Sequence, residues 1–165
     1  MQVTITKACK AQVNEITEIY NLGIQSRLAT FDLTQVPASK VATWFEQIDR
    51  YPVLVATAAN QTLGWARLMP YRPRACYQPI VEYSVYLADS AQGKGVGFKL
   101  MNELLAQAKS LGYRKVVSRI FTDNKASLAL CQKLGFRTVG VYYQHGQIDG
   151  QWLDVAIVEY LIDQG

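Results

Sequence analysis

The chain has 165 residues, half of them hydrophobic, and a formal net charge of +4 at pH 7. This length and apolar content predict a single domain, residues 1–165, with one core. The positive residues are scattered and form no basic block, so we expect no nucleic-acid partner, and the charge balance suits a small anionic ligand. No stretch is long and apolar enough to span a membrane, and MQVTITKACK lacks the apolar run of a secretory signal. We therefore expect a cytoplasmic protein without a membrane partner.

Cysteine and histidine usage does not indicate a metal centre. Cys9, Cys76 and Cys131 are widely separated and form no C-x-x-C pair, so neither a zinc site nor a disulfide framework is expected. The single histidine, His145, lies in QHGQIDG, a turn-like stretch in which a solvated imidazole is the more common role. A serine-histidine triad could use only this residue, and we discount it.

Alternating and helical hydrophobic periods predict the elements of the first half of the chain. Pro52 should end the second helix, because the residue before a proline avoids the helical region. Residues 59–61 form a short connection typical of an antiparallel hairpin. The predicted elements are a strand at 3–8, a helix at 13–24, a loop at 26–37, a helix at about 38–51, and strands at 53–58 and 62–69.

The second half begins with an irregular loop that contains two prolines and ends in a hairpin. Gly112 and Gly135 follow two predicted helices at the position where glycine commonly ends a helix, and Asp123 or Asn124 can cap the second of them. The predicted elements are a loop at 71–79, a strand at 80–87, a helix at 96–111, a strand at 115–121, a helix at 125–134, and strands at 138–143 and 152–162 around HGQIDG.

Three glycines stand in AQGKGVG, residues 91–97, between a predicted strand and a predicted helix. A Rossmann fingerprint would need a further glycine at Phe98, and a P-loop would need Ser or Thr after its Gly-Lys pair. What remains is a Gln-x-x-Gly-x-Gly turn that opens a helix, whose free N–H groups suit a pyrophosphate. On this segment alone, a glycine turn without a ligand fits equally well.

Two segments carry a resemblance to a known family. EYSVYLADSAQGKGVGFKLM resembles the acyl-CoA signature of the GNAT superfamily of N-acetyltransferases, and TDNKASLALCQKLGFRTVG is similar to that superfamily's asparagine-containing segment. Within it, SRLATFDLTQVP, VEYSVY and GQWLD resemble the phosphinothricin (methionine sulfoximine/sulfone) acetyltransferase group. The resemblance implies an α/β fold with a mixed, mostly antiparallel sheet flanked by helices. It also implies acetyl-CoA as co-substrate without a metal, a small amine or amino-acid analogue as acceptor, and a possible homodimer.

Glu82 is the candidate catalytic base. In a strand it shares a face with Ser84 and Tyr86, and the family's glutamate matches this position. The alternative is an ordinary solvent-facing glutamate; the glycine turn directly after the strand favours the base.

The remaining cofactor residues follow from the resemblance. Backbone groups of β-strand residues would pair with the pantetheine arm, and main-chain N–H groups of the turn would hold the pyrophosphate. Asn124 could equally be a helix cap, and a solvated side chain is the commoner role for Lys133. The candidate cofactor-binding residues are Val85, Tyr86, Leu87, Gln92, Gly93, Lys94, Gly95, Val96, Gly97, Asn124, Ser127 and Lys133.

The acceptor pocket departs from the group's pattern. Candidate substrate residues are Phe31, Asp32, Arg72 and Glu82; Arg72 matches an arginine of the group, whereas Asp32 replaces its usual glutamate. Gln78 and Ile148 stand where group members can carry Arg and Lys. Cys131 replaces the Tyr or His that serves as general acid, and a packing role is expected for it.

Two other functions stay open at this point. The acceptor could be a protein N-terminus or lysine, although the long loops at 29–37 and 71–79 favour a small closed pocket. The chain could also be a non-catalytic acetyl-CoA-binding module, for which the missing acid at Cys131 is the only sign.

Overall fold

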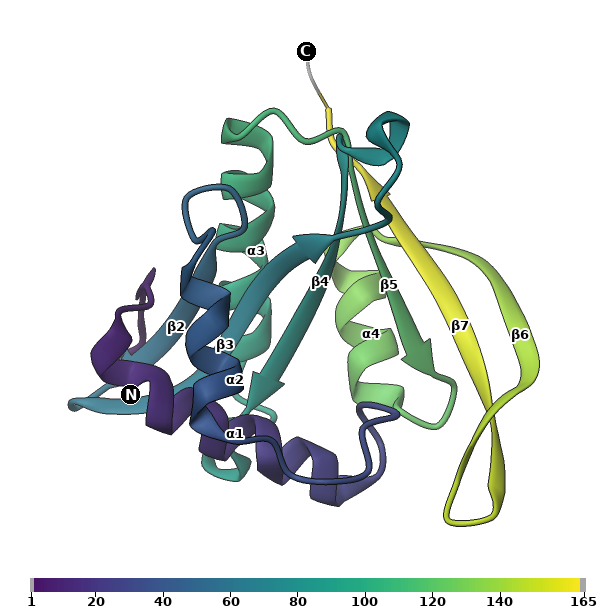
Figure 1. The fold of residues 1–165 in the computed structure, drawn as a ribbon, viewed down its shortest axis with the longest axis horizontal. Coiled ribbons are helices and arrows are strands. Elements are labelled where there is room, and N and C mark those ends of the chain that lie inside the picture. The colour runs from purple at the N-terminus through teal and green to yellow at the C-terminus, as the bar shows by residue number, and fades with distance from the viewer. Residues whose placement is uncertain (1, 164–165) are drawn as a thin grey trace.

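In the described part of the chain, seven strands form one sheet in the order β1-β2-β3-β4-β5-β7-β6 (Figure 1). The structure is a computed structural model and describes residues 2–163. All neighbouring strands are antiparallel except β4 and β5, which are parallel. The predicted mixed, mostly antiparallel sheet is therefore confirmed. The strands are β1 (Thr4–Lys7), β2 (Val53–Ala58), β3 (Gln61–Pro70), β4 (Ile80–Leu87), β5 (Lys115–Phe121), β6 (Arg137–Ile148) and β7 (Gln151–Leu161).

Helices cover both faces of the sheet. Helices α1 (Val13–Ser26) and α2 (Ala38–Ala42) lie on one face, and α3 (Val96–Ser110) and α4 (Lys125–Leu134) lie on the other (Figure 1). Four short 3-10 turns connect them: Lys10–Gln12, Thr43–Phe45, Ala75–Tyr77 and Asp89–Ala91. Among residues 2–163, no helix has the length and apolar content needed to cross a membrane.

The predicted helix at 38–51 is shorter in the structure. Helix α2 ends at Ala42, and a 3-10 turn over Thr43–Phe45 and further turns lead to β2. Thr, Trp and Phe have low helix propensity, and the irregular backbone still packs Trp44, Phe45 and Ile48 against the core on this face. Hydrophobic spacing alone thus overestimated the helix.

The last hairpin also differs from the prediction. Strand β6 continues to Ile148, and the turn is only Asp149-Gly150, with φ values of 50° and 79°. Asp-Gly suits such a tight turn with both residues at positive φ. The register shifts between Tyr142 and Gly146, which lets the strand resume after an irregularity. His145 therefore lies within β6 and outside the turn.

Strands β4 and β5 pair over only three positions, Ile80 to Glu82 against Lys115 to Val117. Beyond this point the two strands diverge (Figure 1), although β4 continues to Leu87 and β5 to Phe121. Next to Glu82, the Tyr83 carbonyl accepts a hydrogen bond from the Ser118 hydroxyl of β5. The backbone groups of β4 that face β5 beyond Tyr83 have no partner strand. Such groups need a partner from a side chain, water or a ligand.

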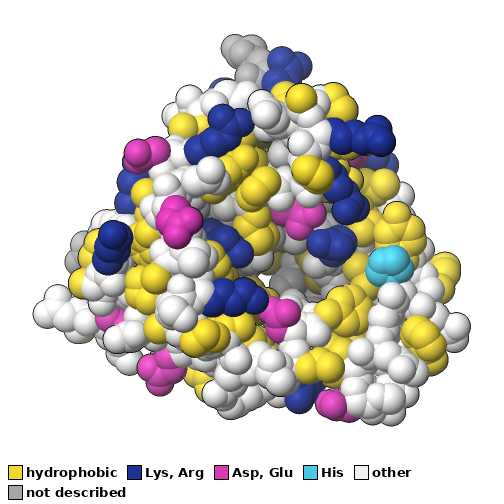
Figure 2. All heavy atoms as spheres, viewed as in Figure 1, with side chains coloured by type: hydrophobic (Ala, Val, Ile, Leu, Met, Phe, Trp, Pro, Cys, Tyr) yellow, Lys and Arg dark blue, Asp and Glu magenta, His cyan; other side chains and the backbone are white. Residues whose placement is uncertain are grey.

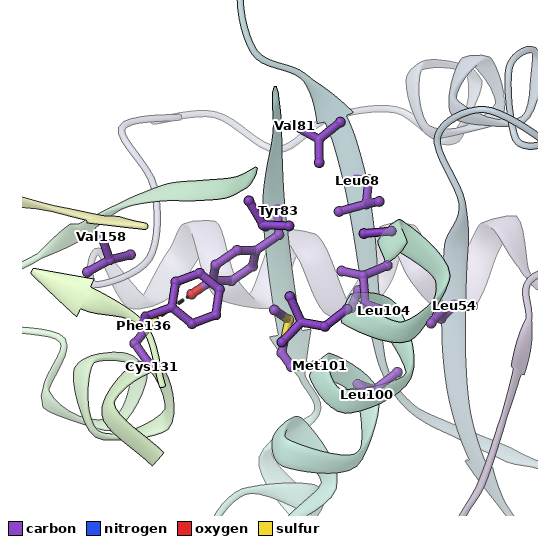
Figure 3. Packing of buried hydrophobic residues seen from close by; sticks show 14 of the residues in the cluster. Leu54, Leu68, Val81, Tyr83, Leu100, Met101, Leu104, Cys131, Phe136 and Val158 are labelled. Atoms are coloured by element: carbon purple, nitrogen blue, oxygen red, sulfur yellow. Dashed lines mark hydrogen bonds between the residues drawn. The ribbon is translucent and has the colours of Figure 1, made fainter. Parts of the chain in front are cut away.

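The main core lies between the sheet and helices α3 and α4 (Figure 3). Its strand residues alternate along β4, so that Val81 and Tyr83 face this core. The Tyr83 hydroxyl lies 2.8 Å from the Sγ of Cys131, which is only 2% exposed. Burial raises the pKa of both groups, so each stays protonated at neutral pH. This environment supports the expected packing role of Cys131.

The three cysteines should react at two distinct rates. Cys9 and Cys76 are exposed, whereas Cys131 is buried with a raised pKa. Titration of the native protein with Ellman's reagent should therefore modify two thiols rapidly and the third only after denaturation. The Cys131→Ala variant, as control, should lose only the slow thiol. Three rapidly reacting thiols would contradict the buried position of Cys131.

Candidate active site

A cavity of about 400 Å³ opens on the face of the sheet that α1 and α2 cover. The register of β3 and β4 pairs Trp65 with Tyr86, Arg67 with Ser84 and Met69 with Glu82, which places all six side chains on this face. Figure 2 shows acidic and basic side chains gathered around a hollow on this side of the molecule. The cavity is lined by Tyr20, Ala29, Thr30, Phe31, Asp32, Trp44, Trp65, Arg67, Met69, Glu82, Tyr83, Ser84, Tyr86, Ser118, Arg119, Phe121, His145 and Val155.

Glu82 lies at the point where β4 and β5 separate. It is the last residue of β4 that pairs with β5, and its side chain is 16% exposed. The Arg119 guanidinium on β5 lies 3.6 Å from its carboxylate. Glu82 therefore presents its carboxyl group to the cavity beside the edge of β4 that has no partner strand, a position from which a carboxylate can accept a proton from a bound amine.

The loop between α1 and α2 closes one side of the cavity. The Tyr20 hydroxyl donates a 2.5 Å hydrogen bond to the Asp32 carboxylate. Burial and this bond raise the pKa of Tyr20 to about 12, so the phenol remains a donor at neutral pH. The Phe31 ring packs edge-on against Phe121, with centroids 4.6 Å apart. These contacts bring the predicted substrate residues Phe31 and Asp32 to the same cavity as Glu82.

Aromatic rings form the wall behind this loop. Tyr86 stacks on Trp65 with centroids 4.9 Å apart, and Tyr20 lies edge-on to both rings. Gly23 of α1 provides the space for this arrangement, because a Cβ there would lie 2.5 Å from the Tyr86 ring. The three rings therefore pack densely against one another in this part of the wall.

The glycine turn between β4 and α3 has the conformation that the sequence predicts. Gly93 and Gly95 have φ values of 72° and 78°, and no atom lies within 4 Å of a Cβ built at either. These two glycines are therefore required by the backbone conformation and not by lack of space. No side chain caps α3, so its first N–H groups remain available to an anion.

Gly97 has a different environment, because a Cβ there would lie 3.4 Å from Leu130 of α4. This is an ordinary van der Waals distance, so the packing of α3 on α4 leaves room for a Cβ at this position. Lys94 and Gln92 are exposed in the same turn. The candidate pyrophosphate residues thus lie together at the N-terminus of α3.

Asn124 caps α4 and also contacts the loop after α1. Its side-chain oxygen accepts a hydrogen bond from the Ser127 N–H, and its Nδ2 donates to the Leu28 carbonyl, both at 3.2 Å. The Lys133 ammonium lies over the Phe98 ring, 4.5 Å from its centroid, next to the first turn of α3. The helix-cap interpretation of Asn124 is confirmed, and its role toward a cofactor stays a prediction.

Arg72 does not line the cavity. Its side chain is exposed and its guanidinium lies 5.0 Å from the centroid of the Tyr71 ring. Ile148 is buried with Phe121 and Val155. Contact of Arg72 with an acceptor therefore stays a prediction that the cavity lining does not support.

Sequence reasoning missed the two arginines and the histidine of the cavity: Arg67, Arg119 and His145. Arg67 interrupts the apolar strand TLGWARLM and Arg119 interrupts KVVSRIF, and a charge within an apolar strand is a detectable signal. His145 had no such signal, because its position depends on the irregularity in β6. In the described part of the chain, His, Cys, Asp and Glu side chains form no group of three or more that could hold a metal ion.

Residues 16–136 match the model of the acetyltransferase (GNAT) family. The chain belongs to this family. An L-methionine sulfoximine/L-methionine sulfone acetyltransferase of Pseudomonas paraeruginosa is 35% identical over 99% of this chain and 96% of its own length. The resemblance seen in the sequence motifs, the expected GNAT fold and the expectation of an acetyltransferase are thereby confirmed.

Two solved GNAT structures are similar over the full chain. YncA, a protein of Salmonella typhimurium solved with its cofactor acetyl-CoA, superposes with a TM-score of 0.95 at 33% identity, covering 100% of this chain and 96% of its own. A phosphinothricin acetyltransferase of Sinorhizobium meliloti, solved with acetyl-CoA, has a TM-score of 0.94 at 33% identity, with coverage of 100% and 91%.

Gly23→Ala should destabilise the protein although alanine favours helices. The new Cβ would overlap the Tyr86 ring, and overpacking of this kind costs about 1–3 kcal/mol, more than the ~1 kcal/mol gained in helix propensity. Urea unfolding should give a lower free energy of unfolding for this variant. Gln25→Ala, at an exposed position of the same helix, should be within about 0.5 kcal/mol of the parent. A more stable Gly23→Ala variant would contradict the described packing.

Proposed function

We propose that the protein transfers the acetyl group of acetyl-CoA directly to the amine of a small amino-acid-like molecule, of the phosphinothricin or methionine sulfoximine type. The observation that carries this proposal is the position of Glu82. Its carboxylate faces a cavity of small-molecule size at the point where β4 and β5 part. The names of the similar proteins support the acceptor class.

The residues present fit acetyl-CoA as donor. The unpaired edge of β4 at Val85 to Leu87 offers backbone groups to an extended amide-containing arm. The uncapped N-terminus of α3, with the turn from Gln92 to Gly97, offers N–H groups to a pyrophosphate. Asn124, Ser127 and Lys133 lie on α4 or at its start. When bound, acetyl-CoA supplies an acetyl thioester.

Glu82 then acts as the general base. It accepts the proton that the acceptor amine loses as the nitrogen–carbon bond forms. A backbone N–H of β4 near Val85 would donate to the oxygen on which negative charge develops. Cys131 contributes no acid to this scheme, because its thiol is buried in the core against Tyr83. The departing thiol sulfur would take its proton from water.

The enclosure of the cavity favours a small acceptor over a protein. The Tyr20–Asp32 hydrogen bond and the Phe31–Phe121 contact hold the loop after α1 across one side of the cavity. An extended peptide would need a groove open at both ends. A non-catalytic binding module is less consistent with a carboxylate placed at the opening of β4. The free thiols of the three cysteines suit the reducing cytoplasm that we propose as its location.

Glu82→Gln tests the proposal. The amide keeps the shape of the side chain but cannot accept the proton, so kcat for acetylation should fall by about 10²–10⁴-fold. Products would be measured by mass spectrometry with phosphinothricin, methionine sulfoximine, methionine sulfone, polyamines and short peptides. The affinity of Glu82→Gln for acetyl-CoA, measured by calorimetry, should equal that of the parent protein. As a control, Glu103→Gln on the exposed face of α3 should leave turnover intact. Preferred acetylation of peptides, or turnover unaffected by Glu82→Gln, would refute it.

We also propose a homodimer through the β6–β7 hairpin. Strand β6 is an edge strand that is exposed along most of its length. Tyr142, Tyr143 and Trp152 on this hairpin are 53%, 78% and 58% exposed, and exposed large apolar side chains commonly mark interfaces.

Light scattering coupled to gel filtration should give a mass twice the 18.5 kDa of the chain. The double variant Tyr143→Glu with Trp152→Glu should give a single-chain mass, because it introduces charge into the proposed interface. Leu22→Glu on α1, where Leu22 is 42% exposed, serves as control and should stay dimeric. A single-chain mass for the parent protein would contradict the proposal.

A further inference from the structure

Arg67 is a cation in the cavity wall that the proposed chemistry does not use. It lies in the middle of β3, opposite Ser84 and on the same face of the sheet as Glu82. Its guanidinium lies over the Trp44 ring, 3.8 Å from the centroid. The Nε atom is buried and has no hydrogen-bond partner among the residues that the structure describes. The side chain therefore runs along the wall, and its buried part is unsatisfied.

The charge of Arg67 is retained although burial opposes it. Desolvation lowers the pKa of Arg67 to about 10, which still leaves the guanidinium protonated at neutral pH. Both acidic groups of the cavity have other partners. Glu82 pairs with Arg119, and Asp32 accepts the hydrogen bond of Tyr20. Among residues 2–163, no carboxylate forms an ion pair with Arg67.

The contact with Trp44 does not replace an anionic partner. A cation–π contact stabilises a cation by about 0.5–2 kcal/mol and uses only the face of the guanidinium. The N–H donors lie on the edge of that plane, in a fork that matches a carboxylate or phosphinate. An apolar side chain of similar length would fill the same space without a desolvation cost, so packing alone does not account for arginine here.

We propose that Arg67 binds an anionic group of the acceptor, a carboxylate or a phosphinate, and thereby selects amines that carry such a group. This inference rests on the proposed function for the identity of the acceptor. Arg67 and Glu82 are diagonal neighbours on adjacent strands, a relation in which residues lie roughly 7–8 Å apart and their Cβ atoms somewhat closer. A molecule a few bonds long can place its amine at Glu82 and its anion at Arg67.

Arg119 is less suited to this role. It lies on the other side of Glu82, is 55% exposed, and already contacts the Glu82 carboxylate. Its loss should affect all acceptors alike, because it acts on the base and not on a particular acceptor group. Arg119 therefore offers a matched control for Arg67, with the same charge in the same cavity.

Four acceptors separate the possible anions. Phosphinothricin carries both a carboxylate and a phosphinate, and methionine sulfone carries the carboxylate alone. 3-Aminopropyl(methyl)phosphinic acid carries the phosphinate alone, and 3-(methylsulfonyl)propylamine carries neither. We would measure kcat/KM for each with the parent protein, Arg67→Met, Arg67→Lys and Arg119→Met. Acceptors that react too slowly would be measured as competitive inhibitors of the best one.

Arg67→Met should lower kcat/KM by about 100-fold for acceptors that carry the recognised anion, mainly through KM, and by less than about threefold for 3-(methylsulfonyl)propylamine. The acceptor that loses most identifies the carboxylate or the phosphinate as the bound group. Arg67→Lys should recover part of the loss, because it keeps the charge without the fork. Acetyl-CoA affinity and the melting temperature should not fall in Arg67→Met.

An equal loss for all four acceptors, or no loss, would overturn the inference, as would a selective loss in Arg119→Met in place of Arg67→Met. Acceptor binding measured by calorimetry separates this failure from failure of the proposed function. If the parent protein acetylates none of the four amines, the proposed function fails. The inference then stands only if Arg67→Met weakens binding of the anionic amines and not of the neutral one.

Discussion

The separation of β4 and β5 is the constraint on which the site depends. Two parallel strands that pair over three positions and then part leave one strand edge without its usual partner. The hydrogen-bond ladder between the two strands is therefore incomplete. Backbone N–H and C=O groups without a partner raise the free energy of the fold unless water, a side chain or a ligand binds them. The glycine turn begins at the end of the same strand, and the acidic side chain Glu82 marks the last paired position. One strand thus places three components of the proposed site.

Alternation along β4 divides its side chains between two environments. Val81 and Tyr83 pack into the core against α3 and α4, as Figure 3 shows, while Glu82 and Ser84 face the cavity. A shift of register by one residue would exchange the two sets. The dense core on one side therefore fixes which side chains of β4 face the cavity on the other, among them the proposed base Glu82. Stability and chemistry are specified by the same strand.

Local patterns predicted much of the fold from the sequence. Strand β4, helix α4 and the glycine turn depend on near neighbours, such as the glycines at positive φ and the Asn124 cap, and the sequence analysis placed them correctly. The positions of Arg67 and His145 depend on register between distant segments and on an irregularity in β6, neither of which leaves a local signal. Arg72 shows the converse, since a matching motif does not place a side chain in a cavity.

The side chain of Asn124 connects the start of α4 to the loop after α1. Its carbonyl oxygen holds the first turn of α4, beside the proposed donor site, and its amide nitrogen holds Leu28 in the loop that encloses the acceptor cavity. Aspartate could supply the oxygen but not the nitrogen donor. A single amide thus joins two segments 96 residues apart. Replacement of Asn124 by aspartate would therefore release the loop after α1 from the start of α4 while keeping the oxygen that caps the helix.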